Sequence, residues 1–322
     1  LFAELSLSSQ CAVSTKPLTK AFGWTSMDVF RQHDVQELCR ILFDALSIAS
    51  DNLRGVLQRL YEGSFADTIE CPLCGYKRES RSVFLDLQIP VENIPSIEEA
   101  MAQFVSVEQL DEHNLWTCSE CGQKVRALKA TELHALPPIL TLHLKRFVFD
   151  LATYRRRKLS DPLLFTEHLD MTPFAPRAVK GETEEEGETE DLGYDLFAIL
   201  IHAGTAHGGH YHAYIRHPET SRWFDFNDAS VGELTEEDLF HLFHGDLQDA
   251  SKQTNREEEG GGGGGGKGRM EFGGGTPEPE VVLPSSEKKG EEGEEKKEED
   301  EVFIQPSRSH GACNAYYLVY RR

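Results

Sequence analysis

The amino-acid sequence predicts an α+β fold on three observations. The first sixty residues carry apolar side chains at helical spacing, whereas residues 64–89 have the texture of strands. Two later segments, residues 139–147 and 197–202, are apolar enough to be buried strands of a main sheet. A further strand-like run, residues 314–320, follows a long low-complexity stretch. Helices followed by strands in this way are typical of the α+β class.

Helical signals dominate the N-terminal part. Asp34-Val-Gln-Glu37 has the form of a capping box, with an N-cap acid and a second acid three residues later. Behind it, apolar residues recur at helical spacing as far as Leu46, and residues 53–60 suggest another short helix. Helix capping accounts for Asp34 and Glu37 without any further function, but it does not account for Gln36.

Strand signals begin at Ser64 and continue, with one interruption, to the middle of the chain. Residues 65–70, 76–83 and 84–89 are each expected to form strands. Residues 96–110 predict a helix that begins at Ser96 and has acids in its first turn.

Two segments interrupt this pattern. Residues 181–191 carry seven acids and no base, so we expect an exposed acidic loop over residues 176–192. Residues 251–310 contain seven consecutive glycines and a Glu/Lys tract, a composition that cannot bury enough apolar surface to offset chain entropy. We expect this segment to be disordered. Because a lone strand after it has nothing of its own to pack on, the segment is expected to be an insertion within one domain that closes in residues 311–322.

Charge and composition exclude several classes of protein. The formal net charge is −22, of which residues 181–191 and 251–301 together carry −14. The remaining −8 argues against a nucleic-acid binder, which needs a basic face, and suits either a basic protein partner or a solvated surface. No apolar run reaches the roughly 18 residues of a membrane span. The first residues do not resemble a signal peptide, so we expect a cytoplasmic or nuclear protein that is not secreted.

Four of the seven cysteines form two CxxC pairs, Cys71 with Cys74 and Cys118 with Cys121, separated by 43 residues. Zinc binds four thiolates in a tetrahedron, which two such turns at neighbouring hairpin tips can supply. Two unrelated turns or one redox pair are the alternatives. The Gly after each pair and the absence of a helix start favour a structural zinc ion over both. Because sulfur fills all four positions, we expect no catalytic cofactor here, and the odd cysteine count fits a reducing compartment.

A predicted β-hairpin carries the most informative residues of the chain. Residues 210–215 alternate as a strand does, and residues 223–227 alternate likewise. Between them, residues 217–220 form a four-residue turn signal. This hairpin resembles, in its residue types, the base and orienting half of a nucleophilic catalytic site.

The register of this hairpin decides which side chains meet. If Arg216 pairs with Ser221, His210 lies directly opposite Asn227 on the same face. Directly opposed Cβ atoms are about 4.5–5.5 Å apart, close enough for an Asn to hold an imidazole in one tautomer. A slip of one residue would bring Asp228 to the place of Asn227.

A histidine on a strand is more often a packed, hydrogen-bonded core residue than a catalytic one. Here Gly208 and Gly209 precede His210 and permit close approach of a ligand backbone, and the hairpin brings an amide opposite. These features favour catalysis for His210. His207 and His212 are interpreted as structural residues or as residues near the substrate.

Five segments, in the same order, resemble the boxes that characterise the ubiquitin-specific proteases. The match covers most of residues 1–250 together with 311–322, excludes both low-complexity segments, and is specific because all five boxes are present in order. The five are Phe22-Gly-Trp24 with Gln32-His-Asp-Val-Gln-Glu-Leu38, Leu136-Pro-Pro-Ile-Leu-Thr-Leu-His-Leu-Lys-Arg-Phe147, Gly208-Gly-His-Tyr211, Trp223-Phe-Asp-Phe-Asn-Asp228 and Asn314-Ala-Tyr-Tyr-Leu-Val-Tyr320.

The resemblance implies a papain-like cysteine protease fold, incomplete at its N-terminus, in one catalytic domain of a larger multidomain protein. Residues 1–62 would be the remainder of a helical thumb, residues 63–135 the fingers with their zinc ribbon, and residues 136–250 a β-rich palm. The insertion 251–310 and a last palm strand within 311–322 would follow.

The resemblance also implies thiol-dependent hydrolysis of the isopeptide bond after the C-terminal Gly-Gly of ubiquitin, with ubiquitin and ubiquitinated proteins as partners. His210 would be the general base, Asn227 its orienting partner, and Asp228 would assist in or near the oxyanion site. The two CxxC pairs match the zinc ligands of the fingers. The residues that match those binding the extended ubiquitin tail are Asp34, Gln36, Glu37 and Tyr211.

One departure from the family pattern concerns the nucleophile. The family carries it in a box of the form Asn-x-Gly-x-Thr-Cys-Tyr, which this sequence lacks, and Cys11, Cys39 and Cys313 have no such context. Cys39 is expected within the apolar face of a helix. We therefore expect the chain to be the C-terminal larger part of a deubiquitinase catalytic domain and to be inactive alone. The alternative is a catalytically dead ubiquitin-binding pseudoenzyme, against which the retained His210 and Asn227 argue.

Overall fold

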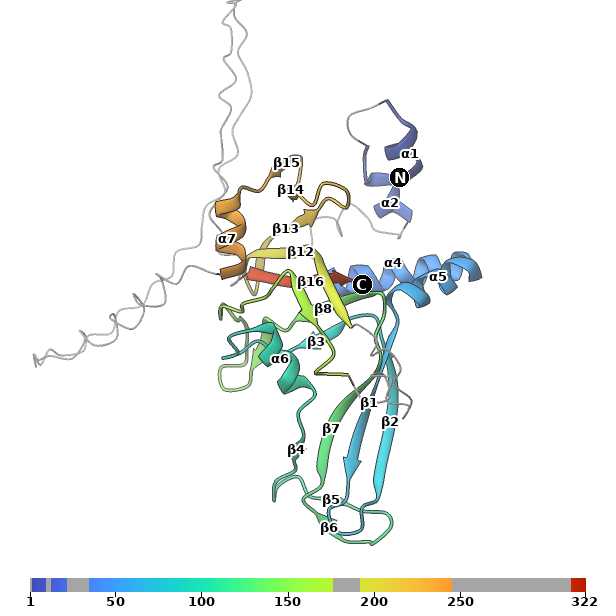
Figure 1. Ribbon diagram of the computed structural model, residues 1–322, viewed down its shortest axis with the longest axis vertical. Helices are drawn as coiled ribbons and strands as arrows, with labels where there is room; N and C mark the ends of the chain where they lie inside the picture. The colour runs from blue at the N-terminus through green and yellow to red at the C-terminus, as the bar shows by residue number, and fades with distance from the viewer. Residues whose placement is uncertain (1, 10–12, 22–34, 176–191, 245–313) are drawn as a thin grey trace, which may run out of the picture. The chain divides into compact units, whose positions relative to one another are not determined.

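The structure is a computed structural model (Figure 1). The described residues all belong to one unit, Leu1–Gly245 with Ser309–Arg322, and the other unit, Asp246–Arg308, lies outside them. Several sequence predictions also fall outside, namely those for Asp34, Cys11, Cys313, the acidic loop and the insertion 251–310. The described ranges are 2–9, 13–21, 35–175, 192–244 and 314–322.

The two helices predicted before residue 62 are both present, as α4 and α5. The second of these packs on the first, with the rings of Phe43 and Tyr61 4.9 Å apart. None of the described helices is long and apolar enough to cross a membrane. In chain order they are α1 (Phe2–Leu7), α2 (Lys16–Ala21), α4 (Val35–Ala49), α5 (Asp51–Tyr61), α6 (Ile97–Phe104) and α7 (Glu236–His244).

An eight-stranded sheet, called the palm sheet below, contains most of the C-terminal strands. Its order is β15-β14-β13-β12-β16-β8-β3, with β11 paired to β12, and every pairing is antiparallel except β3 with β8. The last strand of the chain therefore lies between β12 and β8, in the interior of the sheet. The strands are β3 (Leu87–Ile89), β8 (Ile139–Leu144), β11 (His168–Asp170), β12 (Gly193–Thr205), β13 (Gly208–Arg216), β14 (Trp223–Asn227), β15 (Ser230–Glu233) and β16 (Ala315–Arg321).

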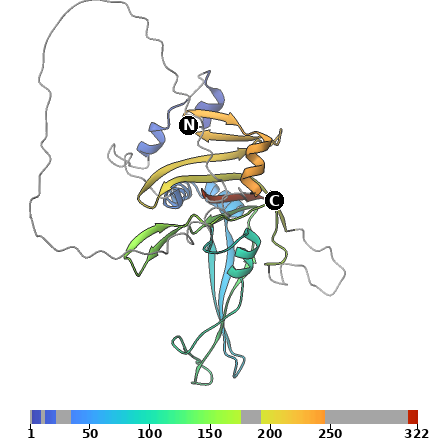
Figure 2. The ribbon, with the colours of Figure 1, turned by 90° about the vertical axis from the view of Figure 1, so that its left-hand side faces the viewer.

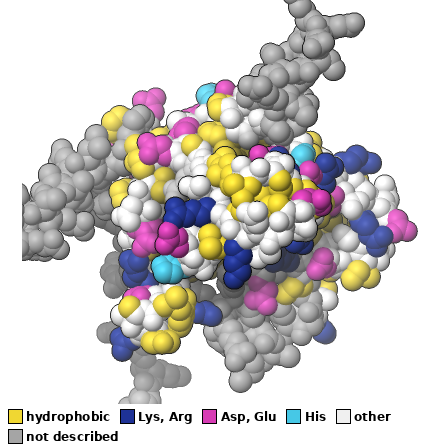
Figure 3. Space-filling model, turned by 90° about the horizontal axis from the view of Figure 1, so that it is seen from below, with side chains coloured by type: hydrophobic (Ala, Val, Ile, Leu, Met, Phe, Trp, Pro, Cys, Tyr) yellow, Lys and Arg dark blue, Asp and Glu magenta, His cyan; other side chains and the backbone are white. Residues whose placement is uncertain are grey.

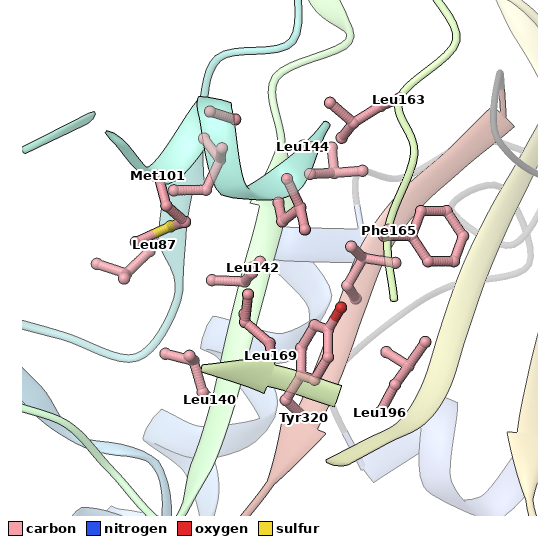
Figure 4. Packing of buried hydrophobic residues seen from close by; sticks show 14 of the residues in the cluster. Leu87, Met101, Leu140, Leu142, Leu144, Leu163, Phe165, Leu169, Leu196 and Tyr320 are labelled. Atoms are coloured by element: carbon pink, nitrogen blue, oxygen red, sulfur yellow. The ribbon is translucent and has the colours of Figure 1, made fainter. Parts of the chain in front are cut away.

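The main hydrophobic core lies against the palm sheet. Met101 of α6 packs with side chains of β3 and β8, and Tyr320 of β16 lies among them (Figure 4). Helix α7 contributes Phe243, whose ring is 5.8 Å from that of Phe165 and 6.2 Å from that of Trp223. Figures 1 and 2 both show α7 beside the palm strands. This packing fixes β12, β13 and β14, which carry the candidate site.

A second sheet, called the finger sheet below, has the order β2-β1-β7-β4. Figures 1 and 2 show β1, β2 and β7 as long neighbouring strands, with the short pair β5–β6 at one end of them. A separate hairpin of β9 and β10 follows β8. The bounds are β1 (Gly63–Glu70), β2 (Lys77–Phe84), β4 (Glu108–Gln109), β5 (Trp116–Thr117), β6 (Lys124–Val125), β7 (Leu128–Ala135), β9 (Phe147–Asp150) and β10 (Arg155–Lys158).

Three predicted elements differ from the structure. The strand predicted over residues 84–89 is reduced to Leu87–Ile89, because Phe84 is the last residue of β2 and residues 85–86 form a bend. The helix predicted over residues 96–110 begins as expected, because the Ser96 hydroxyl accepts a bond from the Glu99 amide, but it ends at Phe104. The strand predicted over residues 139–147 is interrupted between β8 and β9, because the side chain of Arg146 turns into the core and is completely buried.

Charged side chains of both signs lie close together on the surface. Figure 3 shows Lys and Arg side chains beside Asp and Glu side chains on the face seen from below. Several basic side chains of the described residues form ion pairs with acids, which limits the positive potential that any one of them contributes. These pairs are Lys77–Glu132, Arg81–Glu79, Arg126–Glu112 and Arg157–Glu92.

Candidate active site

His210 of β13 and Asn227 of β14 form a hydrogen-bonded pair. Nε2 of His210 lies 2.6 Å from Oδ1 of Asn227. An amide oxygen can only accept, so this contact assigns a proton to Nε2, and in the neutral imidazole Nδ1 then carries the lone pair. The His210 side chain is 45% exposed, so a proton donor can reach it. The arrangement is that of a base held in one tautomer by a carboxamide.

The predicted register of the hairpin is wrong by two residues. Arg216 pairs with Trp223, not with Ser221, because the connection is a six-residue loop closed by a hydrogen bond from the His217 amide to the Arg222 carbonyl oxygen. Ser221 adopts a positive φ of 56° within this loop. A shift of two residues keeps every side chain on its face of the sheet.

The shift changes how His210 and Asn227 meet, not whether they meet. They are diagonal neighbours, since continuing the observed register would put Asn227 opposite His212. Diagonal neighbours are within reach of long side chains on the same face. The cross-strand ladder between β13 and β14 ends at the Ala213–Phe226 pair, so His210 and Asn227 lie just beyond it.

Asp228 lies next to this pair. Its Oδ2 is 3.7 Å from Nε2 of His210, and its side chain is 80% exposed. Asp228 adopts a positive φ of 51° in the turn from β14 to β15, which directs the carboxylate to the same imidazole. At this distance and exposure the carboxylate contributes a screened attraction for the imidazolium and no orienting hydrogen bond.

Gly209 is required by its own hairpin. A Cβ atom there would lie 2.6 Å from Nε2 of His202, and closer still to the carbonyl oxygen of Ala203. The close approach that the glycine permits is therefore to β12. Burial, with a smaller contribution from the Lys158 ammonium, lowers the pKa of His202 to about 4, so this imidazole is neutral at pH 7.

Replacing Gly209 with Ala is expected to destabilise the fold by about 2–3 kcal/mol, because the added methyl group must displace backbone. Chemical denaturation measures the change in unfolding free energy. Gly232→Ala is the matched control, since a Cβ on that palm-sheet glycine meets nothing within 4 Å. Equal stability of the two variants would contradict this account of Gly209.

A second imidazole pair lies beside the first and was not predicted. Nδ1 of His212 is 2.8 Å from Oδ1 of Asp225, and both side chains are largely buried. The rings of His210 and His212 are nearly parallel, with centroids 6.4 Å apart. The signal in the sequence was the spacing of two residues, which puts His212 on the face of His210 and Asp225 on the face of Asn227.

The residues that the resemblance assigns to the ubiquitin tail lie on two elements. Asp34 is outside the described residues, and Glu37 is exposed on α4. Nε2 of Gln36 donates to Oδ1 of Asp86, at 2.6 Å, so part of its amide is engaged within the protein. Tyr211 of β13 packs its ring 4.6 Å from that of His202. Gln36 and Glu37 thus lie on α4, whereas Tyr211 lies on β13.

No described thiol hydrogen-bonds to His210. Cys39 lies on α4 as expected, and its side chain is exposed. Cys11 and Cys313 are outside the described residues, and the four remaining cysteines lie together at the end of the finger sheet.

Those four cysteines form one cluster. The sulfur atoms of Cys71, Cys74, Cys118 and Cys121 all lie within 4.8 Å of one another. The Cys71–Cys121 and Cys74–Cys118 sulfur separations are 3.9 and 3.6 Å. A tetrahedral ion with metal–sulfur bonds of about 2.3 Å requires sulfur separations of about 3.8 Å. The cluster therefore fits a four-coordinate metal ion.

Two equivalent turns bring these sulfur atoms together. Each CxxC pair is followed by a glycine with positive φ, Gly75 at 71° and Gly122 at 67°. The amide of each glycine donates to the carbonyl of the first cysteine in its pair, at 2.9 and 3.0 Å. Burial raises the pKa of the Cys71 thiol, but hydrogen bonds from the backbone at Cys74 and Leu73 and from neighbouring thiols lower it to about 7. Cys71 is thus close to forming the thiolate that metals bind.

Comparison with known proteins identifies relatives of this chain. The family model described as ubiquitin carboxyl-terminal hydrolase matches residues 1–320. The chain is 34% identical over 311 residues to ubiquitin carboxyl-terminal hydrolase 47 of Drosophila melanogaster, covering 76% of the chain and 20% of that protein. It is 41% identical over 221 residues to ubiquitin carboxyl-terminal hydrolase 40 of Homo sapiens, covering 67% of the chain and 17% of that protein. The chain thus spans about a fifth of the length of these relatives.

A solved structure shares the fold. It is that of the SAGA Ubp8/Sgf11/Sus1/Sgf73 DUB module bound to ubiquitin aldehyde, with a TM-score of 0.59 and 28% identity, covering 69% of this chain and 50% of that one. The predicted fold class, α+β with the papain-like arrangement of this protease family, is confirmed.

Proposed function

The chain belongs to the ubiquitin carboxyl-terminal hydrolase family, and we propose that it supplies the base and its orienting residue to a thiol-dependent deubiquitinase. The observation that carries the proposal is the 2.6 Å contact between Nε2 of His210 and Oδ1 of Asn227. It leaves Nδ1 as the atom that exchanges protons with a nucleophile and a leaving group.

The proton transfers follow from this geometry. Nδ1 of His210 takes the proton of a thiol, whose sulfur attacks the carbonyl carbon of the last Gly in the C-terminal Gly-Gly of ubiquitin. The resulting imidazolium then gives that proton to the departing amine as the C–N bond breaks, which leaves a thioester. Water, deprotonated by His210, hydrolyses the thioester and restores the thiol. Asn227 keeps Nε2 protonated through all steps, and Asp228 stabilises the imidazolium weakly.

We propose that the attacking thiol comes from an Asn-x-Gly-x-Thr-Cys-Tyr box upstream of this sequence. The 322 residues contain no such box, and no described thiol hydrogen-bonds to His210. The chain alone would then bind ubiquitin without hydrolysing ubiquitin conjugates. The ubiquitin aldehyde bound to the similar DUB module supports ubiquitin as the partner.

We also propose that the four-cysteine cluster holds a structural zinc ion. The sulfur separations support this assignment, and four thiolate ligands leave no position for water or substrate. When bound, the ion would crosslink the turn after β1 to the turn between β5 and β6.

The test compares two proteins, the 322-residue chain and the same chain with its upstream sequence, called the extended protein below. Ubiquitin–amidomethylcoumarin measures hydrolysis, and isothermal titration with ubiquitin measures binding. We expect both proteins to bind ubiquitin and only the extended protein to hydrolyse ubiquitin–amidomethylcoumarin. Iodoacetamide should abolish this hydrolysis.

Two outcomes would overturn the proposal. Turnover by the chain alone that survives Cys11→Ala and Cys39→Ala would mean that the reaction needs no thiol from another segment. Binding without hydrolysis in the extended protein would establish the pseudoenzyme alternative.

A further inference from the structure

Lys158, the last residue of β10, donates hydrogen bonds to two other parts of the chain. Its Nζ lies 2.5 Å from the carbonyl oxygen of His202 and 3.3 Å from that of Gly204, both in β12. It lies 2.8 Å from Oδ1 of Asn314, the residue before β16. An ammonium group has three donors and no acceptor, so it can serve all three oxygens at once.

The two carbonyl groups lie where β12 extends past β16. The ladder between these strands ends at the Ile201–Ala315 pair. Carbonyl groups two residues apart point to the same side of a strand, so those of His202 and Gly204 share one edge. The ammonium of Lys158 thus takes the place that further backbone amides of β16 would occupy.

The same stretch of β12 supports the candidate base. Ala203, between the two carbonyl groups, pairs with His210 in the β12–β13 ladder. Its own carbonyl oxygen faces β13, because a Cβ on Gly209 would touch it. Lys158 therefore fixes the backbone on both sides of the residue opposite His210, and a movement of this end of β12 would carry His210 with it.

Lys158 is itself held in place by packed neighbours. Phe147 pairs with Lys158 across the β9–β10 hairpin and packs its ring 5.1 Å from that of His202. The buried Arg146 donates from Nε to the carbonyl oxygen of Ala315, at 2.6 Å. The two cations thus attach the start of β16 to the β9–β10 hairpin. These contacts hold the ammonium group of Lys158 in place.

We propose that Lys158 is a positioning residue for the base, which holds the end of β12 so that His210 keeps its ring against Asn227. This inference rests on the proposed function of His210. Loss of the ammonium would free the edge of β12 and allow the contact between Nε2 of His210 and Oδ1 of Asn227 to lengthen. Misplacement of a catalytic group by about 1 Å lowers a rate by about 100-fold.

Steady-state kinetics of the extended protein provide the first test. Lys158→Met removes the donors and keeps the aliphatic stem, Lys158→Arg keeps charge and donors, and Lys145→Met is the control because its exposed side chain lies in the same segment. We expect Lys158→Met to lower kcat about 10- to 100-fold with KM changed by less than about twofold. Lys158→Arg should recover part of the loss, and Lys145→Met should match the wild type.

Nitrogen-15 NMR of histidine side chains in the 322-residue chain provides the second test, because it needs no hydrolysis. In the wild type the His210 signals should report a proton on Nε2, and in Lys158→Met they should shift toward exchange between tautomers. Lys145→Met should leave them unchanged. Unaltered His210 signals and unaltered kcat in Lys158→Met, with only a lower melting temperature, would show a purely structural lysine and overturn the inference.

The two tests also separate this inference from the proposed function. If the wild-type extended protein does not hydrolyse ubiquitin–amidomethylcoumarin, the proposed function fails, and the NMR signals of His210 still decide whether Lys158 positions the ring.

Discussion

Replacing His210 with Ala in the extended protein is expected to lower kcat for ubiquitin–amidomethylcoumarin by about 10⁴-fold or more. In the proposed mechanism the imidazole moves the proton in every step, because its Nε2 is engaged by Asn227 and its Nδ1 is available to the nucleophile. Ubiquitin affinity should change little, since the ring acts on the reacting atoms. Stopped-flow or steady-state fluorescence measures kcat, and titration calorimetry measures the affinity.

The neighbouring side chains should give a graded series. Asn227→Ala removes the 2.6 Å hydrogen bond that holds the His210 imidazole in one tautomer, so kcat should fall by about 100-fold. Asp228→Ala removes an exposed carboxylate 3.7 Å away, so the loss should be less than about tenfold. His168→Ala is the control, because that exposed histidine pairs with Asp195 at the opposite end of β12. A loss for Asp228→Ala that exceeds the loss for Asn227→Ala would reverse the assigned roles.

Removal of zinc is expected to unfold the end of the finger sheet while the palm sheet stays folded. The buried residues of the cysteine cluster are only Cys71, Cys118, Val125 and Ala127 among those described, and β5 and β6 have two residues each. So small a core cannot offset the chain entropy of residues 71–76 and 116–125 at the tip of the finger sheet. Binding to four thiolates supplies about 10 kcal/mol or more of folding free energy in small zinc domains.

Two measurements check this expectation. Elemental analysis should find one zinc ion per chain in the wild type and almost none in Cys118→Ser, whereas Cys39→Ser, a change on α4, should keep the metal. Hydrogen exchange after treatment with a chelator should show lost protection over residues 71–76 and 116–125 and retained protection in β8, β12 and β16. Full protection of the finger tip without metal would refute the zinc assignment.

The proximity of His210 and Asn227 was predictable because an error in loop length that moves the strand register need not change the face of the sheet on which a side chain lies. Alternation fixes which side chains share a face, and the wrong loop length moved the register by an even number of residues. Loop length itself was not predictable, because the positive φ of Ser221 is set by the folded loop and not by a Gly or Asn signal in the sequence. The second pair, His212 with Asp225, shares that face as well, and the predicted register would have placed these two residues directly opposite each other, whereas in the structure they are diagonal neighbours.

The contacts of Lys158 could not be predicted from the sequence, for a different reason. Its three acceptors come from β12 and from Asn314, which is 156 residues further along the chain. No local pattern reports such a contact. The end of α6 at Phe104 was missed on similar grounds, since residues 108–109 pair with β7 and draw the chain into the finger sheet. Tertiary pairing there overrides helical periodicity.

The position of β16 has a consequence for how the molecule is made. A ribosome releases β8, β12 and all the other palm strands before the residues of Ala315–Arg321 emerge, yet those residues separate β12 from β8 in the finished sheet. Until then the two halves of the palm sheet expose unpaired strand edges. Such edges can aggregate or be bound by chaperones. Completion of the palm sheet during synthesis therefore depends on residues 315–321.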